Sequence, residues 1–313
     1  MVRSCVRELV VVLAVASFPA RADWFCTARP DLRQTVSRLF SALEDNYFIT
    51  GIPADAKTST NQVKFQLSFK FDLLPNEGPC GLFFGYTQRS LWNAWDLSGS
   101  SPFKDSNYNP QLFVVFGIKD LSAVRSLPSA RKLHFFWARM GIEHESNGFA
   151  GPTSRSWSRL FAAARFGVWF QPGDIIYVTF EPRLWVPFVP GRDADGGGNP
   201  DILDYVGLGQ LKTEVGWHSL LHDGRWQDLN LSVFLRKGLV GSRGTAELTL
   251  RYRPPWHFTS FSFYGQAFFG YGETLLHYNE RTTAWRFGIA FDDRFSWKTG
   301  APGEVQWPPP PPP

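Results

Sequence analysis

Residues 63–72 read VKFQLSFKFD, and this alternation decides the fold class. Every second residue is apolar, and the residues between them are polar or charged. The apolar set is Val63, Phe65, Leu67, Phe69 and Phe71. Successive side chains of a β-strand point to opposite faces of a sheet, so a period of two separates the two sets. We therefore expect a strand here with one apolar face and one polar face.

The same alternation recurs along most of the chain, for example in residues 229–235, 246–252 and 285–291. Many of these segments are roughly 9 to 13 residues long, which suits a tilted transmembrane strand. We count twelve of them, an even number of the kind found in single-chain bacterial barrels. They begin near Asn46, Gln62, Cys80, Gln111, Leu133, Trp157, Ile175, Ile202, Trp226, Thr245, Ser260 and Thr283.

The aromatic content indicates which face of these strands meets solvent. Aromatic residues make up 16% of the chain, with 29 Phe and 13 Trp. A soluble sandwich or small barrel also alternates, but its closed interior could not hold so many large apolar side chains. We therefore predict an all-β fold, a twelve-stranded antiparallel transmembrane β-barrel, with apolar residues toward lipid and charged residues inside. The closed sheet pairs every backbone group, as a bilayer requires.

The two ends of the chain differ from this body. Residues 1–22 combine a basic start, a short apolar core and an Ala-Arg-Ala end, which is typical of a secretory signal peptide. We expect a periplasmic segment over 23–45, either a short helix or a loose arm, then the barrel over 46–295 and a Pro-rich tail over 296–313. The expected location is the outer membrane of a Gram-negative cell. Whether Cys26 and Cys80 pair is left open.

Charge and connection lengths limit the function classes further. The net charge of +4 is small for 313 residues and argues against a dedicated nucleic-acid binder. Short connections belong on the periplasmic side of a barrel and long ones outside. The connections at 75–79, 171–174 and 254–257 are short, whereas those at 91–110, 145–156 and 186–201 are longer. The connection at 120–132 is an exception on the short side.

One stretch, residues 141–160, carries groups suited to catalysis. His144 and Ser146 are two residues apart and share a strand face, so a neutral imidazole there can take the serine proton. Both follow the apolar register of the preceding strand, and Ser158 leads into the apolar register of the next one. These three residues should therefore converge on the lipid-facing wall. The alternative is a merely solvated histidine and loop serine, although polar groups on such a wall are costly.

Several short motifs together resemble the bacterial outer-membrane phospholipase A family. They run in order along nearly the whole barrel segment and read VKFQLS (63–68), YTQRS (86–90), SSPF (100–103), NY (107–108), HESNG (144–148), PTSRSW (152–157) and GYGE (270–273). No single motif is specific, but the combination is. The family's twelve-stranded barrel agrees with the independent strand count.

The resemblance implies a calcium-dependent serine hydrolase that cleaves acyl esters of membrane phospholipids, with phospholipase A1, A2 and lysophospholipase activity. Ser146 would be the nucleophile and His144 the general base. Ser158 stands where the family has an asparagine that orients the histidine, and a serine hydroxyl is shorter and its rotor freer.

The resemblance also implies the calcium (Ca2+) ligands and the assembly. The side chain of Ser154, the carbonyl of Phe149 and the carbonyl of Ser100 from a second subunit match ligand positions of the family. Oxygen donors of this kind suit calcium. Gln88 matches a residue that bonds across a homodimer interface, although a glutamine bonded to water is an equal alternative. Two other functions stay open: a catalytically impaired relative with a structural or lipid-binding role, which Ser158 favours, and a passive porin with an open lumen.

Overall fold

The computed structural model describes residues 40–54, 61–74, 80–94, 103–117, 133–170, 176–190, 198–218, 228–254 and 261–291. The expected signal peptide over 1–22, the Pro-rich tail over 296–313 and Cys26 lie outside the described residues. So do the connections at 75–79, 120–132 and 171–174, and the side chain of Cys80.

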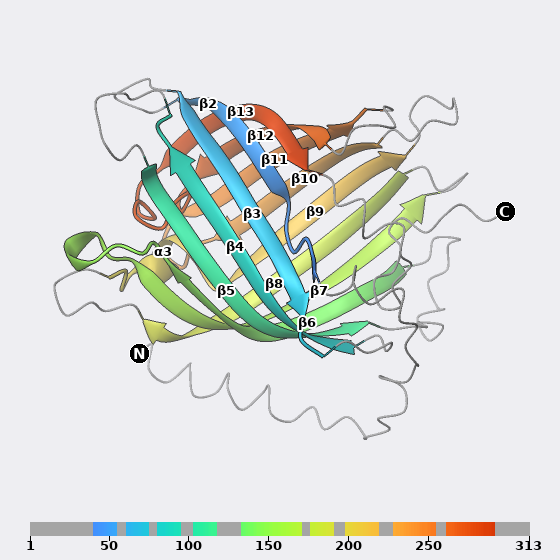
Figure 1. Cartoon of the computed structure of the whole chain (residues 1–313), viewed down its shortest axis with the longest axis horizontal. Helices are drawn as coiled ribbons and strands as arrows, with labels where there is room; N and C mark the ends of the chain where they lie inside the picture. Colours follow the sequence, from blue (N-terminus) through green and yellow to red (C-terminus); the bar gives the residue numbers. More distant parts are fainter. Residues whose placement is uncertain are drawn as a thin grey trace.

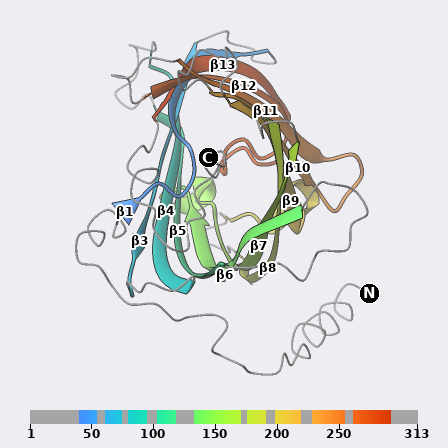
Figure 2. The ribbon, with the colours of Figure 1, turned by 90° about the vertical axis from the view of Figure 1, so that its right-hand side faces the viewer.

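Twelve strands form a closed antiparallel barrel, which confirms the predicted fold class (Figures 1 and 2). The strands are β2 (Asn46–Pro53), β3 (Gln62–Asp72), β4 (Cys80–Trp92), β5 (Phe103–Gly117), β6 (Leu133–Ser146), β7 (Ser156–Phe170), β8 (Ile176–Pro190), β9 (Gly209–His218), β10 (Asp228–Lys237), β11 (Gly244–Arg253), β12 (Phe261–Gly270) and β13 (Thr282–Phe291). Each pairs with its neighbours in sequence, and β13 closes onto β2 from Ala284↔Pro53 to Phe291↔Asn46. None of the helices in the described residues is long and apolar enough to cross a membrane.

Two of the predicted strand starts are wrong, and both errors lie where alternation gives no signal. Strand β5 begins at Phe103 rather than near Gln111. The alternation misses this start because the residues that follow Phe103 are polar and the two faces do not contrast. Near Ile202 the chain forms the helix α3 (Ile202–Val206), and β9 follows only from Gly209. Ile202 and Val206, four residues apart, are the buried positions of α3, which is helical spacing. The other predicted starts lie within two residues of the observed ones.

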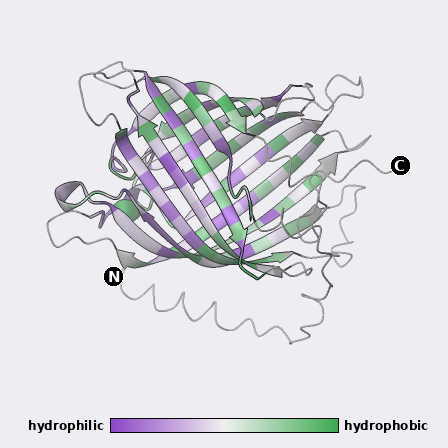
Figure 3. Cartoon of the chain, in the orientation of Figure 1, coloured by the Kyte–Doolittle hydropathy of each residue, from purple (hydrophilic) through white to green (hydrophobic). Residues whose placement is uncertain are grey.

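The two faces of the barrel wall differ as the alternation predicts. Bands of apolar and polar residues alternate along the strands in Figure 3. On β3, Leu67 points outward and is 50% exposed, whereas its neighbours Gln66 and Ser68 point inward and are 6% and 2% exposed. On β13, Phe287 is 66% exposed and Arg286 is fully buried. The outer wall is therefore apolar and the lumen is lined by charged and polar groups.

Ion pairs cross the lumen. Arg286 forms a bidentate pair with Glu273, which also accepts a bond from Lys64 at 3.4 Å. Elsewhere in the lumen, Arg139 bonds Glu44 and Glu181 at 3.1 Å each. The described interior is thus filled by paired side chains, whereas a passive porin requires an open lumen.

The chain enters the barrel by a detour through the lumen. The two-residue strand β1 (Phe40–Ser41) pairs with β3, and residues 42–45 follow before β2 begins. The Asp45 carboxylate reaches Arg251 at 3.1 Å and Lys212 at 3.8 Å, on strands β11 and β9. Residues 40–45 of the expected periplasmic segment are therefore neither a helix nor a loose arm, and residues 23–39 lie outside the described part of the chain.

The mouth of the barrel at the α3 end is covered from inside. The connection between β12 and β13, residues 271–281, packs Leu275 and Tyr278 into a core cluster with Ile202 and Val206 of α3. Burial raises the pKa of Tyr278, and its hydrogen bond to Asp201 raises it further. This cover closes the end of the lumen at which β6 ends and β7 begins.

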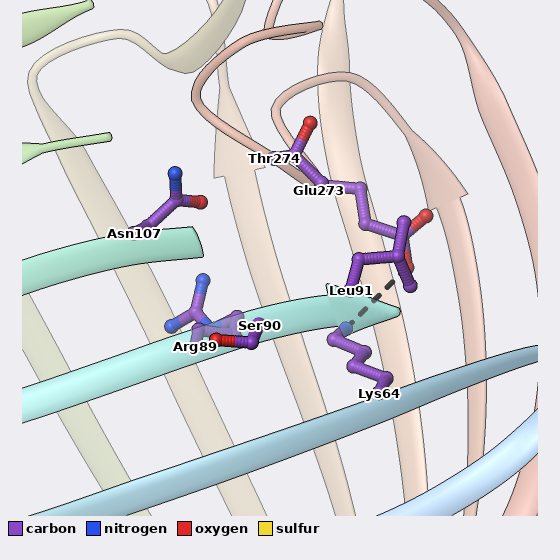
Figure 4. Close-up of a pocket in the computed structure, with 7 residues that line it drawn as sticks. All are labelled: Lys64, Arg89, Ser90, Leu91, Asn107, Glu273 and Thr274. Atoms are coloured by element: carbon purple, nitrogen blue, oxygen red, sulfur yellow. Dashed lines mark hydrogen bonds and ion pairs between the residues drawn. The ribbon is translucent and has the colours of Figure 1, made fainter. Parts of the chain in front are cut away.

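A small polar cavity of about 10 Å³ lies under this cover, enough for about one water molecule. Figure 4 shows Lys64 and Glu273 joined across it, with Arg89 and Asn107 beside them. Burial raises the pKa of the Glu273 carboxyl, but Lys64 and Arg286 outweigh this effect and hold the pKa below its ordinary value. Glu273 therefore stays charged and paired at neutral pH.

Candidate active site

His144 and Ser158 meet on the outer wall of the barrel. They lie directly opposite each other in the β6–β7 register, and the His144 Nδ1 is 3.0 Å from the Ser158 Oγ. Met140 and Ile142 precede His144 on the same face, and Leu160 follows Ser158; all three are about half exposed. The imidazole and its hydroxyl partner thus lie at the end of an apolar strip, on the side of the wall that the sequence predicts.

Ser146 lies at the end of β6, two residues beyond His144 and on the same outward face. Its partners across the sheet are Ser156 on β7 and Tyr108 on β5. The side chain is half-buried. The structure therefore brings the predicted nucleophile, base and orienting residue onto one wall within two neighbouring strands.

The sheet is irregular on both sides of this pair of strands. Between β5 and β6, paired residues are found at Tyr108↔Ser146 and next at Gln111↔Glu143. Pro110 lies in the gap and has no N–H to donate. The His144 carbonyl instead accepts a bond from the Asn109 Nδ2 at 2.9 Å. Between β7 and β8, the register shifts between Ser158 and Arg159.

The connection after Ser146 is organised by one buried asparagine. Asn147 is 2% exposed, and its Oδ1 accepts bonds from the backbone N–H groups of Phe149 and Arg155. Its Nδ2 donates to the Thr153 carbonyl at 2.9 Å. Gly148 and Gly151 have positive φ angles of 71° and 66°, which glycine adopts without strain. Asn147 therefore holds the loop that contains Phe149 and Ser154.

The oxygens of this loop suit a calcium ion. Arg155 donates to the carbonyls of Pro152 and Ser154. Within the described part of the chain, the Phe149 carbonyl and the Ser154 hydroxyl accept no hydrogen bond, so both are free to bind a cation. Uncharged oxygens of this kind are ordinary calcium ligands. Ser100, the third predicted ligand, lies outside the described residues.

The described residues contain no cluster of three or more His, Cys, Asp or Glu side chains that could hold a metal. A site built from a hydroxyl and carbonyls would not form such a cluster. The donor set of the loop fits calcium because a hard cation binds neutral oxygens as well as carboxylates.

Asn199, in the connection between β8 and β9, supports the same loop, and no sequence pattern indicates it. It is 2% exposed, and its Oδ1 accepts the Ser156 N–H at 2.9 Å. Beside it, the Gly198 N–H donates to the Ser154 carbonyl at 2.8 Å. Asn147, by contrast, is followed by glycine, and an Asn-Gly pair is a turn signal that could have identified it.

Gln88 lies on the same outer wall, on β4, and already has partners within the chain. Its Oε1 accepts a bond from the Tyr86 hydroxyl at 3.1 Å, and its Nε2 donates to the Ser90 Oγ at 3.2 Å. Ser90 in turn bonds Ser106 on β5 at 2.8 Å. This row, Tyr86, Gln88, Ser90 and Ser106, is a polar strip in an otherwise apolar wall. We refer to it below as the polar strip.

Comparisons with known proteins show which family and fold the chain is similar to. Residues 41–291 match the sequence model of the family described as phospholipase A1. The phospholipase A1 of Escherichia coli strain K12 is 35% identical over 242 residues, which cover 75% of this chain and 71% of that protein.

Two solved structures are also similar. The outer membrane phospholipase A of Escherichia coli has a TM-score of 0.62 and 31% identity, covering 82% of this chain and 99% of that one. The Salmonella typhi outer membrane phospholipase, a dimer with bound calcium, has a TM-score of 0.61 and 31% identity, covering 81% of this chain and 92% of that one.

Proposed function

Because the chain belongs to the phospholipase A1 family and is an outer-membrane β-barrel, we propose that it is a calcium-dependent serine hydrolase of membrane phospholipids. The observation that carries the proposal is the hydrogen bond of 3.0 Å between His144 and Ser158 on the outward-facing wall, two residues from Ser146. Polar groups that face lipid are energetically unfavourable, and a catalytic role explains why they occur in this wall.

The bond suggests how His144 works as a base. If the Nδ1–H donates to the Ser158 Oγ, the Nε2 is left unprotonated and can accept the Ser146 proton. The Ser146 oxygen then attacks the ester carbonyl carbon, and His144 passes the proton to the departing glycerol oxygen. An acyl-serine remains. Water, deprotonated by His144, attacks the acyl carbon, and the proton returns to the Ser146 oxygen as the fatty acid leaves.

The loop after Ser146 is the proposed calcium site. The Phe149 carbonyl and the Ser154 hydroxyl would hold the ion, with the Ser100 carbonyl of a second copy. Bound there, the ion supplies positive charge near the oxygen that becomes negative in the transition state. Asn147 and Asn199 keep the two donors in place through the backbone bonds described above.

The apolar strip beside the site suggests the substrate class. Ile142 and Leu160, 45% and 52% exposed, would lie along an acyl chain that reaches His144 from within the bilayer. Substrate would arrive laterally, with its head group at the rim of the barrel. A site open along the wall in this way does not select one acyl position, so we propose phospholipase A1, A2 and lysophospholipase activity together.

We further propose that the active form is a homodimer that associates through the wall containing the polar strip. A Gln88 side chain exposed to lipid favours a polar partner over hydrocarbon. The strip satisfies Gln88 within one chain, and rotation of the amide would let it bond a second copy instead. The related Salmonella typhi protein is a dimer.

The second candidate function is a catalytically impaired barrel of the same family. Ser158 favours it, because the short side chain orients His144 less firmly than a carboxamide would. The two candidates differ in one measurable property, hydrolysis that depends on calcium.

The decisive experiment measures hydrolysis of labelled phosphatidylethanolamine by the refolded protein in detergent, with calcium or with a chelator. We expect wild-type activity with calcium, loss of activity with the chelator, and a loss of about 10³-fold or more in Ser146→Ala. Thr213→Ala, which removes a hydroxyl from the outward register of β9, away from His144 and from the polar strip, is the matched control and should keep its activity.

Activity that persists in Ser146→Ala would overturn the choice of nucleophile. A wild-type protein that folds but shows no calcium-dependent hydrolysis would favour the impaired relative. Equal loss in Thr213→Ala and Ser146→Ala would point to general damage to the wall rather than to catalysis.

A further inference from the structure

The strands that carry His144 and Ser158 are weakly held by their outer neighbours at the level of the site. On one side, Pro110 interrupts the β5–β6 ladder between Tyr108↔Ser146 and Gln111↔Glu143. On the other side, the β7–β8 register shifts next to Ser158. Backbone hydrogen bonds normally fix strand register, and a slip of one residue turns every side chain to the other face. The β6–β7 ladder itself is continuous through His144↔Ser158 and Ser146↔Ser156, so this pair of strands keeps its own register but has little backbone support from β5 and β8 at this level.

The lumen side of the same two strands carries a dense set of ion pairs. Glu143 is 4% exposed and lies between Arg159 at 3.0 Å and Arg183 at 2.6 Å. Glu145 accepts bonds from the Arg159 Nη2 at 2.9 Å and from the Trp157 Nε1 at 3.0 Å. Arg159 therefore joins both carboxylates of β6 to β7.

Aromatic rings fix the position of the central guanidinium. Arg159 lies 3.7 Å from the centre of the Trp157 ring and 5.4 Å from that of Trp185. A cation stacked on a ring away from bulk water is held more firmly than an exposed one. The Arg183 guanidinium lies 4.2 Å from the Phe161 ring in the same way. Neither cation can move far without losing both a ring and a carboxylate.

Inward and outward residues alternate strictly along both strands at this level. Glu143 and Glu145 flank His144 on β6, and Trp157 and Arg159 flank Ser158 on β7. The inward pairs thus join the residues on either side of the outward bond. We infer that four inward-facing residues position His144 against Ser158 from inside the barrel. We call them the internal clamp: Glu143, Glu145, Arg159 and Arg183. The inference rests on the proposed function, and it assigns the four residues as positioning residues, not catalytic ones.

The short side chain of Ser158 makes the clamp more important. A serine hydroxyl reaches His144 only when the two strands lie directly opposite each other, whereas a longer carboxamide could follow a displaced imidazole. Small displacements of reacting groups cost activity steeply. The clamp should therefore matter most while residue 158 is serine.

The test compares Glu143→Gln with Glu214→Gln. Glu214 on β9 is also an interior partner of an arginine, Arg165 at 3.2 Å, but Arg165 lies seven residues along β7 from Ser158. We expect Glu143→Gln to lower kcat about tenfold at an unchanged KM, and Glu214→Gln to leave kcat unchanged. Adding Ser158→Asn to Glu143→Gln should restore most of the loss and should help that variant more than it helps the wild type.

Amide hydrogen exchange gives a readout that does not depend on catalysis. In the refolded full-length protein, Glu143→Gln should speed exchange about tenfold or more at residues 143–146 and 156–159, while Glu214→Gln should not. If Glu143→Gln fails to fold, Glu145→Gln replaces it, because the Glu145 carboxylate is less buried and also pairs with Arg159, at 2.9 Å.

Each outcome bears on the inference. Unchanged exchange at these residues in a folded Glu143→Gln or Glu145→Gln protein overturns it, whether or not the protein hydrolyses lipid. Equal loss of kcat in Glu214→Gln also overturns it, because the effect would then be general. Faster exchange in Glu143→Gln, together with a wild type that has no hydrolytic activity, would support the clamp and refute only the proposed function.

Discussion

The two halves of the barrel wall follow the same alternation and differ in what interrupts it. Across β10–β13 the register runs without shifts, and the outward residues are apolar, among them Leu248 and Phe287. Across β4–β8 the register breaks at several points, and the outward wall includes Gln88, His144 and Ser158. Both halves line the lumen with buried ion pairs.

The difference separates what builds the barrel from what the barrel does. An uninterrupted ladder, an apolar outer wall and a paired lumen are enough for a stable barrel in a bilayer. The polar groups on the outer wall and the irregular ladders add nothing to that stability, and they occur together beside Ser146. Substitutions in the β10–β13 half should therefore change stability, and substitutions near β6 and β7 should change activity.

The largest effect on stability should come from Arg286→Met. Arg286 is fully buried and pairs with Glu273. Removing one partner of a buried pair is strongly destabilising, and here it leaves Glu273 with Lys64 alone, so we expect a loss of about 3 kcal/mol in the free energy of unfolding. Urea titration of the protein in detergent, followed by tryptophan fluorescence, measures it. Folded Arg286→Met protein should still hydrolyse phospholipid at nearly the wild-type rate.

The same pair predicts how acid acts on the variant. Lys64 and Arg286 hold the pKa of Glu273 below its ordinary value. The stability contributed by Glu273 is therefore complete above the ordinary carboxyl pKa of about 4.3 and is lost as the pH falls through the lowered pKa. Without Arg286 that pKa rises, so acid unfolding should begin at a higher pH in Arg286→Met. Identical acid profiles would show that the pair does not control Glu273.

A charge placed on the apolar wall should have the next largest effect. Leu248 on β11 is 40% exposed on the outer wall. Leu248→Arg should destabilise the protein in lipid vesicles by about 2–4 kcal/mol, the cost of arginine near the middle of the bilayer. Leu248→Met is the matched control and should be nearly neutral. If both variants unfold alike, this face does not meet hydrocarbon, and the assignment of the two walls is wrong.

The smallest effect, and the one most specific to the site, should come from Ser158→Asn in the wild-type background. The carboxamide oxygen can accept the His144 Nδ1–H with less rotational freedom, so we expect kcat to rise about threefold to tenfold. Initial rates of hydrolysis at saturating calcium measure it, with Thr213→Asn on the outward register of β9 as control. A fall in kcat would mean that the site is adapted to serine.

The alternation of residues predicted the fold class, most strand starts and the outward position of His144, Ser146 and Ser158, because a period of two fixes the face of each residue. It failed at α3 and at the start of β5, where inward residues such as Asp105 are polar and no contrast between faces exists. Asn109 and Asn199 could not be ranked from sequence, because their partners are backbone groups brought together by the barrel, whereas the Asn-Gly turn signal could have identified Asn147. The internal clamp joins residues of β6, β7 and β8, and spacing along the chain does not reveal such pairs.

The detour of residues 42–45 has a consequence for how the barrel stays shut. The seam between the first and last strands, β2 and β13, is where a closed sheet must be sealed last. Glu44 and Asp45, immediately before β2, are tied to β6, β9 and β11 on other parts of the wall. They act as a crossbar inside the cylinder, so the first strand can peel from the seam only if ion pairs on distant strands also break.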